Sequence, residues 1–255
     1  MKRILLAALA ASVMTAGSAS AADMAARPMV TKAAPVAPMV NWSGFYAAVG
    51  GGYGMASTDS TLVTDPAGAF VANDGSIGGK GYFGRVQLGY DYQFLPSWVA
   101  GVFADYDFSD IKGTALSPLA GGTTNPWSQK SAWAAGGRIG YLVTPQVLSY
   151  FDGGYSASKF NGGELSSAIT GAPVTITAGN QRYSGYFLGG GTEMMLGLLG
   201  PGWFVKSEYR YASYSSKNIP ITLDATGASI LFAQTNKPTV QTISTSLVYK
   251  FGWPR

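Results

Sequence analysis

The stretch YFGRVQLGYDYQF, residues 82–94, alternates between two kinds of side chain with a period of two. Successive side chains of a β-strand point to opposite faces of a sheet, so this spacing predicts a strand with two unlike faces. One face carries Tyr82, Gly84, Val86, Leu88, Tyr90 and Tyr92, and the other carries Phe83, Arg85, Gln87, Gly89, Asp91 and Gln93. We therefore expect a sheet with one aromatic face and one polar face.

Seven more segments alternate in the same way, which predicts eight strands in total. We place the other seven at about 43–54, 98–109, 131–143, 147–158, 183–195, 203–211 and 239–253. The connections 95–97, 144–146 and 196–202 are short and contain Pro or Gly. The connections 55–80, 110–129, 159–182 and 212–238 are long and rich in Gly, Ser, Thr and Asn, as expected of solvated loops. Short turns at one end, long loops at the other and an even strand count are typical of an outer-membrane barrel, with turns and both termini in the periplasm.

The composition supports an all-β protein and excludes much catalytic chemistry. Tyr and Phe are plentiful, and only 12% of the residues are charged. The chain has no His and no Cys, so it lacks the commonest general base and has no thiolate metal ligand or disulfide. Lys and Arg are scattered singly rather than clustered, which argues against nucleic-acid binding. We expect no catalytic residue, no cofactor and no metal site.

The N-terminus has the features of an export signal. Lys2 and Arg3 precede an apolar stretch that is too short to span a bilayer, and small residues lead to a cleavage site after Ala21 or Ala22. We predict a signal peptide over 1–21, a Pro/Ala-rich periplasmic lead-in over 22–42 and an outer-membrane β-barrel over 43–253.

Alternation alone does not tell which face of a barrel points outward, because a soluble lipocalin-like barrel also alternates. Side-chain volume distinguishes the two. The aromatic face collects roughly twenty rings, whereas the interior of an eight-stranded barrel barely accommodates ordinary side chains. We therefore predict that the rings face lipid and that the polar face, with its many glycines, lines the interior. Trp42, Trp98, Trp203 and Trp253 fall at predicted periplasmic strand ends, which favours an interface girdle.

The polar face carries a set of charges of both signs that we expect to lie inside the barrel. These residues are Arg85, Asp91, Asp105, Asp107, Arg138, Asp152, Glu193, Lys206, Glu208, Arg210 and Lys250. They could form a paired network that fills the interior, or they could line a narrow selective channel. We favour the network because eight strands leave little free space. On this interpretation Glu193 and Lys206 are close neighbours across two antiparallel strands.

Two terminal motifs carry a family resemblance. NWSGFY at 41–46, followed by GYG at 52–54, and LVYKFGW at 247–253 resemble the first and last strands of the porin-like outer-membrane immunogenic proteins of alphaproteobacteria. The resemblance spans nearly the whole chain. It implies an eight-stranded outer-membrane barrel, often a surface antigen, without a soluble peptidoglycan-binding domain.

The leading functional hypothesis is a structural, surface-exposed barrel that supports the cell envelope. Its expected partners are outer-membrane lipid, lipopolysaccharide and the barrel assembly machinery, which would engage the C-terminal strand. A narrow porin-like diffusion channel is the first alternative, and an adhesin or ligand-binding barrel that acts through the long loops is the second. A membrane-embedded hydrolase or acyltransferase is weakest, since such enzymes generally need a histidine. GKGYFGRV at 79–86 matches a kinase glycine loop, but the rest of that signature is missing.

Overall fold

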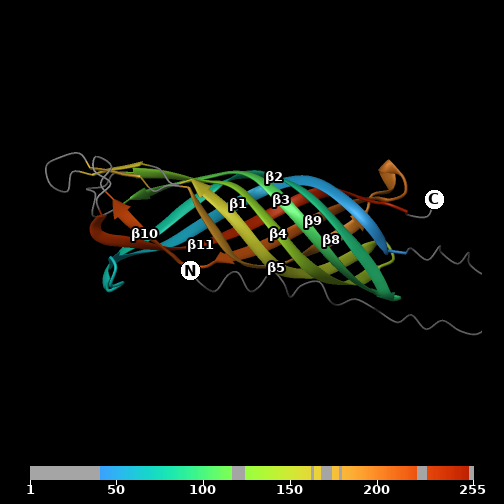
Figure 1. Ribbon diagram of the computed structural model, residues 1–255. Helices are drawn as coiled ribbons and strands as arrows, with labels where there is room; N and C mark the ends of the chain where they lie inside the picture. The colour runs from blue at the N-terminus through green and yellow to red at the C-terminus, as the bar shows by residue number, and fades with distance from the viewer. Residues whose placement is uncertain are drawn as a thin grey trace, which may run out of the picture. The chain divides into compact units, whose positions relative to one another are not determined.

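A closed β-barrel makes up the computed structural model, which describes residues 41–116, 124–161, 164–167, 174–177, 180–222 and 229–252. Eight long antiparallel strands form it, each paired with the next along the chain, and β1 also pairs with β11 (Figure 1). The eight are β1 (Gly44–Thr64), β2 (Phe70–Leu95), β3 (Trp98–Leu116), β4 (Thr124–Thr144), β5 (Val147–Asn161), β8 (Gln181–Met195), β9 (Trp203–Tyr214) and β11 (Ser229–Lys250). The β1–β11 ladder leaves no free edge along the barrel wall. The predicted eight-stranded meander is confirmed.

Three shorter strands and one turn of 3₁₀ helix complete the described residues. Strands β6 (Glu164–Ser167) and β7 (Val174–Thr177) form a separate hairpin, and β10 (Lys217–Thr222) adds to the edge of β11. The 3₁₀ turn η2 (Gly197–Leu199) lies between β8 and β9. Within the part of the chain that is described, there is no helix of the length and apolarity needed to cross a membrane.

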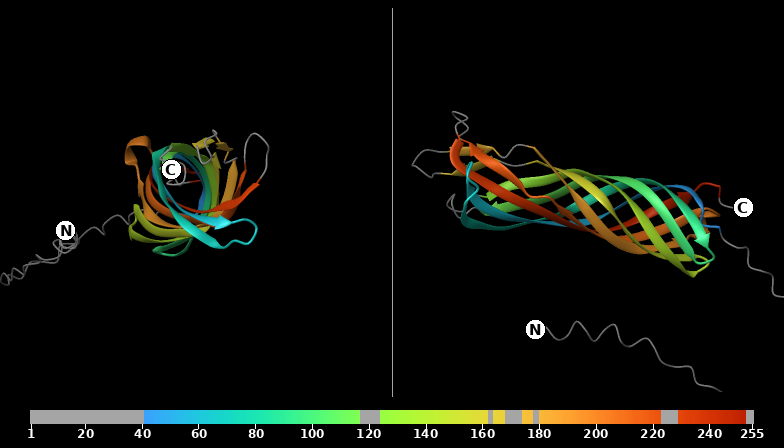
Figure 2. Two further views of the ribbon diagram at one scale, coloured as in Figure 1. Left: turned by 90° about the vertical axis from the view of Figure 1, so that its left-hand side faces the viewer. Right: turned by 60° about the horizontal axis from the view of Figure 1, so that its bottom comes forward.

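The two ends of the barrel differ as the connection lengths predict. The turns at 96–97 and 145–146 and the η2 connection lie at the end where β1 begins and β11 finishes (Figures 1 and 2). We call this the turn end. The opposite end, where β10 and the β6–β7 hairpin lie, is the loop end.

The strands are longer at the loop end than predicted. The sequence predicts a loop over 55–80, but β1 continues to Thr64 and β2 begins at Phe70, so that only residues 65–69 join them. The β1–β2 ladder stays in register from Gly44↔Asp91 to Asp59↔Ser76. Apolar alternation marks a strand in the sequence, and here it ends before the strand does. The ladder continues because each strand supplies backbone hydrogen-bond partners to its neighbour. The segments 110–129, 159–182 and 212–238 are likewise partly strand.

The two faces of β2 separate as the alternation predicts. Leu88 is 67% exposed on the outer face, whereas its neighbour Gln87 is 2% exposed inside the barrel. Exposed Tyr82 and Tyr92 bracket the apolar outer stretch of this strand. Ten residue steps at about 3.3 Å each, on a strand tilted by about 40°, span about 25 Å along the barrel axis, which is the height of a lipid-facing band.

Candidate functional site

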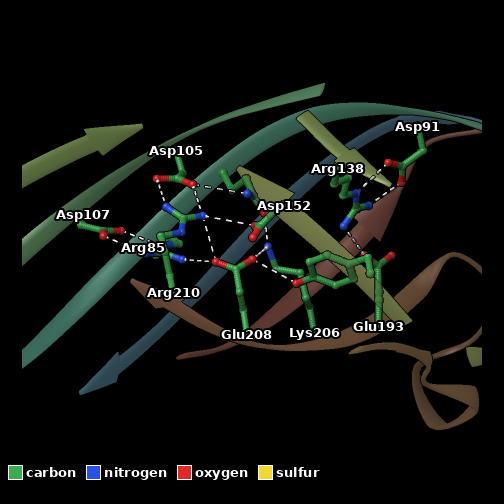
Figure 3. A network of polar contacts seen from close by, with 12 residues as sticks. Arg85, Asp91, Asp105, Asp107, Arg138, Asp152, Glu193, Lys206, Glu208 and Arg210 are labelled. Carbon is green, nitrogen blue, oxygen red and sulfur yellow. Dashed lines mark hydrogen bonds and ion pairs between the residues drawn. The ribbon is translucent and has the colours of Figure 1, made fainter. Parts of the chain in front are cut away.

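The eleven charged residues of the predicted network all lie inside the barrel. Each is buried, with an exposed fraction of 7% or less. They come from every barrel strand except β1, and they separate into two clusters along the interior (Figure 3). The turn-end cluster contains Asp91, Arg138, Glu193 and Lys250, and the central cluster contains Arg85, Asp105, Asp107, Asp152, Lys206, Glu208 and Arg210.

The turn-end cluster pairs two cations with two carboxylates. The Arg138 guanidinium donates to both oxygens of Asp91, at 2.8 and 2.5 Å, and to Glu193 at 2.9 Å. Lys250 Nζ lies 2.5 Å from Asp91 and 3.1 Å from Glu193. Each cation therefore bridges both carboxylates, and this mutual pairing offsets part of the desolvation cost of burying four charges.

The central cluster is organised around Glu208. Its carboxylate receives Arg85 at 2.8 Å and Arg210 at 2.9 Å, and Lys206 lies 3.3 Å away. The Tyr150 hydroxyl donates to the same carboxylate at 3.0 Å. Two guanidinium groups, one ammonium group and one hydroxyl on a single carboxylate make Glu208 the central acceptor of the network.

The remaining carboxylates of the central cluster lie around Glu208. Arg85 also binds both oxygens of Asp107, at 2.7 and 2.9 Å, and Arg210 binds both oxygens of Asp105, at 3.2 and 2.9 Å. Asp152 is the least paired member, since its one ion pair among the described residues is to Arg210 at 3.9 Å. The cluster thus holds four carboxylates and three cations.

The partners differ in part from those that sequence neighbours predicted. Glu193 and Lys206 do face each other in the β8–β9 register. The described ion pairs of Glu193 are nevertheless with Arg138 and Lys250, while Lys206 binds Glu208 and also donates a hydrogen bond to Gln87. The contacts of Glu193 with Arg138 and Lys250, and that of Lys206 with Gln87, cross the interior between strands that are not adjacent, which only the closed barrel brings within reach.

Glycine makes room for the buried carboxylates. A Cβ atom on Gly101 would lie 2.3 Å from Asp91 Oδ1, and a Cβ on Gly189 would lie 2.3 Å from Asp152 Oδ1. On Gly89, the added atom would fall 2.5 Å from the Tyr46 ring. Inward glycines beside long side chains are therefore a packing requirement of this narrow interior.

Aromatic side chains close the interior on either side of the charges, which the sequence analysis did not anticipate. At the turn end, Trp42 is fully buried against Phe204, with ring centroids 4.9 Å apart. Toward the loop end, the Phe160 ring contacts those of Tyr183 and Tyr214 at centroid distances of 5.6 and 6.3 Å. The inner face of the barrel is thus not uniformly polar.

Trp42 contradicts its predicted place in the interface girdle. Its indole N–H donates to the Pro145 carbonyl at 3.2 Å, and its backbone N–H donates to Gln93 at 2.9 Å. Lys250 Nζ lies 4.6 Å from the centre of its ring. Trp42 precedes β1 and so lies outside the strand alternation, and these contacts turn it into the barrel mouth rather than toward lipid.

The other predicted girdle residues behave differently. Trp98 is 40% exposed on the outer face and packs on Tyr141 at a centroid distance of 5.4 Å. Trp203 is half-buried beside Tyr249 at 4.9 Å. Trp253 lies outside the described residues. Strand parity accounts for the outward position of Trp98 and Trp203.

Little space remains beside the central cluster. The central cluster borders a cavity of about 20 Å³, lined among others by Arg85, Asp105, Arg210 and Tyr214. This is room for about one water molecule. In the described part of the chain no three His, Cys, Asp or Glu residues are grouped so as to hold a metal ion. The described charges thus form an ion-paired core inside the barrel.

A comparison with protein families agrees with this architecture. The family model described as outer membrane protein beta-barrel domain matches residues 4–251. The chain belongs to this family. It is therefore an outer-membrane β-barrel protein, located in the outer membrane of a Gram-negative bacterium.

Individual relatives and a solved structure extend the comparison. The chain is 30% identical to the 31 kDa outer-membrane immunogenic protein of Brucella melitensis over 260 aligned positions, which cover 98% of this chain and 100% of that protein. It is 25% identical to outer membrane protein P1 of Coxiella burnetii, with 76% and 77% of the two chains covered. The structure of OprG from Pseudomonas aeruginosa matches with a TM-score of 0.50 at 13% identity, covering 82% of this chain and 97% of that one. The resemblance to immunogenic outer-membrane proteins is confirmed.

Proposed function

We propose that the protein is a structural, surface-exposed barrel of the outer membrane whose interior is closed to ions and which carries out no catalysis. The observation that supports this most directly is the filled interior. Two charge clusters lie in the interior with buried aromatic side chains on either side of them, and the cavity beside the central cluster measures about 20 Å³, which argues against passage of a hydrated ion. A barrel filled in this way contributes rigidity to the envelope instead of transport.

The polar groups that could carry catalysis are committed to one another. Glu208, Asp91 and Glu193 each contact two or more cations. No His is present in the chain to act as a base at neutral pH. A carboxylate held between cations is a poor proton acceptor, so the network is better suited to stabilising the fold than to general-base catalysis.

Planar-bilayer conductance tests the closed interior. The wild-type protein should give no stepwise conductance above the lipid background. As a positive control, Arg138→Ser/Arg210→Ser removes the long side chain that bridges each cluster and should produce small steps, provided that it still shifts its mobility on heating as a folded barrel does. Large, reproducible steps from the wild type would instead establish a diffusion channel.

The orientation of the barrel is part of the proposal. Short turns face the periplasm in barrels of this type, which would place the turn end and both termini inside the cell envelope. An antibody against residues 65–69, the tip between β1 and β2, should label intact cells. Labelling only after the outer membrane is permeabilised would reverse the orientation.

The loop end supports a second candidate function, an adhesin or ligand-binding barrel. Strand β2 begins at Phe70 and passes Tyr82 at the edge of the apolar band, so a stiff β-extension projects beyond that band. The β6–β7 hairpin and β10 add further strands at this end (Figure 2). Replacing residues 57–77 by a two-residue turn should abolish adhesion of expressing cells to a host-cell monolayer if this candidate is correct, while leaving the heat-modifiable barrel intact.

The assembly signal is proposed to be the last strand. Strand β11 closes the barrel on β1, and its outward side chains Leu247 and Tyr249 continue the alternation to Phe251 at the turn end. The barrel assembly machinery would recognise this apolar outer edge. Substituting Tyr249 and Phe251 by Ser should lower the amount of barrel in the outer membrane of expressing cells.

A further inference from the structure

The charges inside the barrel do not balance. Among the described residues, the buried charged side chains comprise five cations and six carboxylates. The turn-end cluster pairs two cations with two carboxylates, so the excess negative charge belongs to the central cluster. A buried charge without a partner is costly, and in practice such a group takes up a proton instead. The central cluster therefore requires one further positive charge.

Asp152 is the carboxylate that lacks a partner. Its side chain is fully buried, and neither of its oxygens receives a hydrogen bond from a described group. The Arg210 nitrogen 3.9 Å from Asp152 Oδ2 also lies 2.9 Å from both Asp105 and Glu208. Arg210 is thus committed to two other carboxylates, and the surplus charge falls on Asp152.

The strands on either side of Asp152 provide no donor for it. Asp152 lies opposite Arg138 on β4 and opposite Gly189 on β8. The Arg138 guanidinium binds Asp91 and Glu193 in the turn-end cluster instead. Gly189 has no side chain, and a Cβ atom there would lie 2.3 Å from Asp152 Oδ1. The carboxyl group is therefore packed against backbone on this side.

The carboxyl groups of Asp152 and Glu208 lie within hydrogen-bonding reach of each other (Figure 3). Two ionised carboxylates cannot form a hydrogen bond, because neither has a proton to donate. One proton between them removes the surplus charge and converts the contact into a charge-assisted hydrogen bond. Closely spaced carboxyl groups that share a proton in this way are known from proteins in which like charges cannot both ionise.

The surroundings place the proton on Asp152. Glu208 is held in its charged form by four donors, which are Arg85, Lys206, Arg210 and Tyr150. Asp152 receives none of these contacts except the distant one from Arg210. The charged or titratable inward groups next to Asp152 on β4, β5, β8 and β9 are Arg138, Tyr150, Glu193, Lys206, Glu208 and Arg210. Asp152 is therefore the acid of the pair, and Glu208 is the acceptor.

A proton fits this position better than a metal ion does. The cavity of about 20 Å³ beside the cluster is lined by Asp105, Asp107 and Arg210 among others, but not by Asp152. Within the described ranges, no three acidic side chains are grouped so as to hold a metal. A proton needs neither a cavity nor further ligands.

We propose that the folded barrel holds one proton at neutral pH, bound between the carboxyl groups of Asp152 and Glu208. The inference goes beyond the structural role, because it makes the stability of the barrel depend on the acidity of its surroundings. An Asp carboxyl in the unfolded chain is ionised above about pH 5, so folding takes up the proton and unfolding releases it. Acid therefore favours the folded barrel, and alkali weakens it.

The composition of the chain makes this proton measurable. The chain contains no His and no Cys, so between about pH 5 and pH 9 only the terminal amine titrates at its ordinary value. In that window the folded state binds one proton more than the unfolded state. The folding equilibrium constant should therefore fall by about tenfold for each pH unit of increase, until the folded barrel itself releases the proton.

The test is urea titration of the refolded full barrel in phosphatidylcholine vesicles, in steps from about pH 5 to pH 9. Asp152→Asn keeps a neutral group of the same shape, so it should match the wild type at the acid end. As the pH rises, the variant should gain about tenfold per pH unit over the wild type. Asp110→Asn removes an exposed carboxylate and is the matched control, which should follow the wild-type profile.

Two measurements remain informative even if a variant folds poorly. On unfolding near neutral pH in weak buffer, the wild type should release about one proton more than Asp152→Asn. The infrared spectrum of the folded wild type should contain the carbonyl band of a neutral carboxylic acid, which Asp152→Asn should lack.

Three outcomes would overturn the inference. The first is parallel pH profiles for the wild type and Asp152→Asn, and the second is a wild-type spectrum without the neutral carboxyl band. The third is a wild-type stability that follows sodium or potassium concentration at constant pH, which would assign the site to a metal cation. A closed barrel that binds no proton refutes only this inference, whereas large conductance steps refute the proposed function.

Discussion

Replacing Glu193 by Ala should be among the most damaging single changes to the barrel interior. Glu193 is fully buried, receives Arg138 at 2.9 Å and lies 3.1 Å from Lys250. Without it, two buried cations share the single carboxylate of Asp91. Breaking a buried ion pair by removing one partner costs about 3–5 kcal/mol, because the remaining charge is left without compensation. The folding equilibrium should therefore shift by roughly two to three and a half orders of magnitude.

The assay is urea titration of the refolded barrel in phosphatidylcholine vesicles, with the folded fraction read from the gel band that shifts on heating. Asp110→Ala is the matched control, since it removes a carboxylate that binds Lys112 at 2.8 Å but in an exposed pair. It should leave the urea midpoint nearly unchanged. A second variant restores the charge balance: Glu193→Ala/Lys250→Met leaves Arg138 paired with Asp91 and should recover part of the loss.

Two results would refute this reasoning. One is an equal midpoint for Glu193→Ala and Asp110→Ala, which would mean that water reaches the turn-end cluster freely. The other is a double variant that is less stable than Glu193→Ala alone, which would mean that Lys250 contributes through packing against Trp42 rather than through its charge.

Three further changes test the faces, the packing and the charge balance. Leu88→Arg places a charge in the middle of the lipid-facing band and should lower the free energy of unfolding in vesicles by about 2–4 kcal/mol. Tyr82→Arg, at the edge of the band, should cost far less. Equal losses of folded barrel from the two variants would invalidate the assigned depth. Gly136→Ala puts a methyl group 2.4 Å from the Gly153 carbonyl oxygen and 2.8 Å from Phe187, and it should cost about 1–3 kcal/mol in the same urea titration. Gly84→Ala, whose nearest neighbour is 3.9 Å away, should be neutral. Asp152→Asn removes the surplus carboxylate of the central cluster and should leave the urea midpoint unchanged or raise it, so a large fall would show that this charge is needed.

The faces of the barrel could be read from the sequence because they depend on local geometry alone. Side chains alternate along any strand, so the parity of Tyr82 through Tyr92 assigned each residue to lipid or interior before any partner strand was known. The short turns were equally local, since Pro96 and Pro145 end their strands by their own backbone restrictions. The inner charges followed from the same parity.

The lengths of the strands and the position of Trp42 did not follow from local pattern. Between Met55 and Thr64 the inward positions of β1 include Thr58 and Ser60, which are polar although they are buried, so the sequence there has no apolar alternation to mark it as a strand. It is a strand because β2 and β11 supply backbone partners along its whole length. Trp42 turns inward because Gln93 and the Pro145 carbonyl, distant in sequence, offer hydrogen bonds at the barrel mouth.

The sequence by itself thus determined that an eight-stranded barrel forms, which side of each strand faces lipid, and that charges of both signs lie inside. Tertiary structure alone decided which charges bind each other. Arg85 reaches Glu208 across 123 positions in the chain, and Lys250 reaches Asp91 across 159. Such contacts depend on the pairing of β1 with β11, which closes the barrel. They also depend on the tilt of the strands, which sets the height of each residue along the barrel axis. A one-dimensional pattern carries the direction of each side chain, but the distance between two side chains on distant strands is a property of the closed barrel.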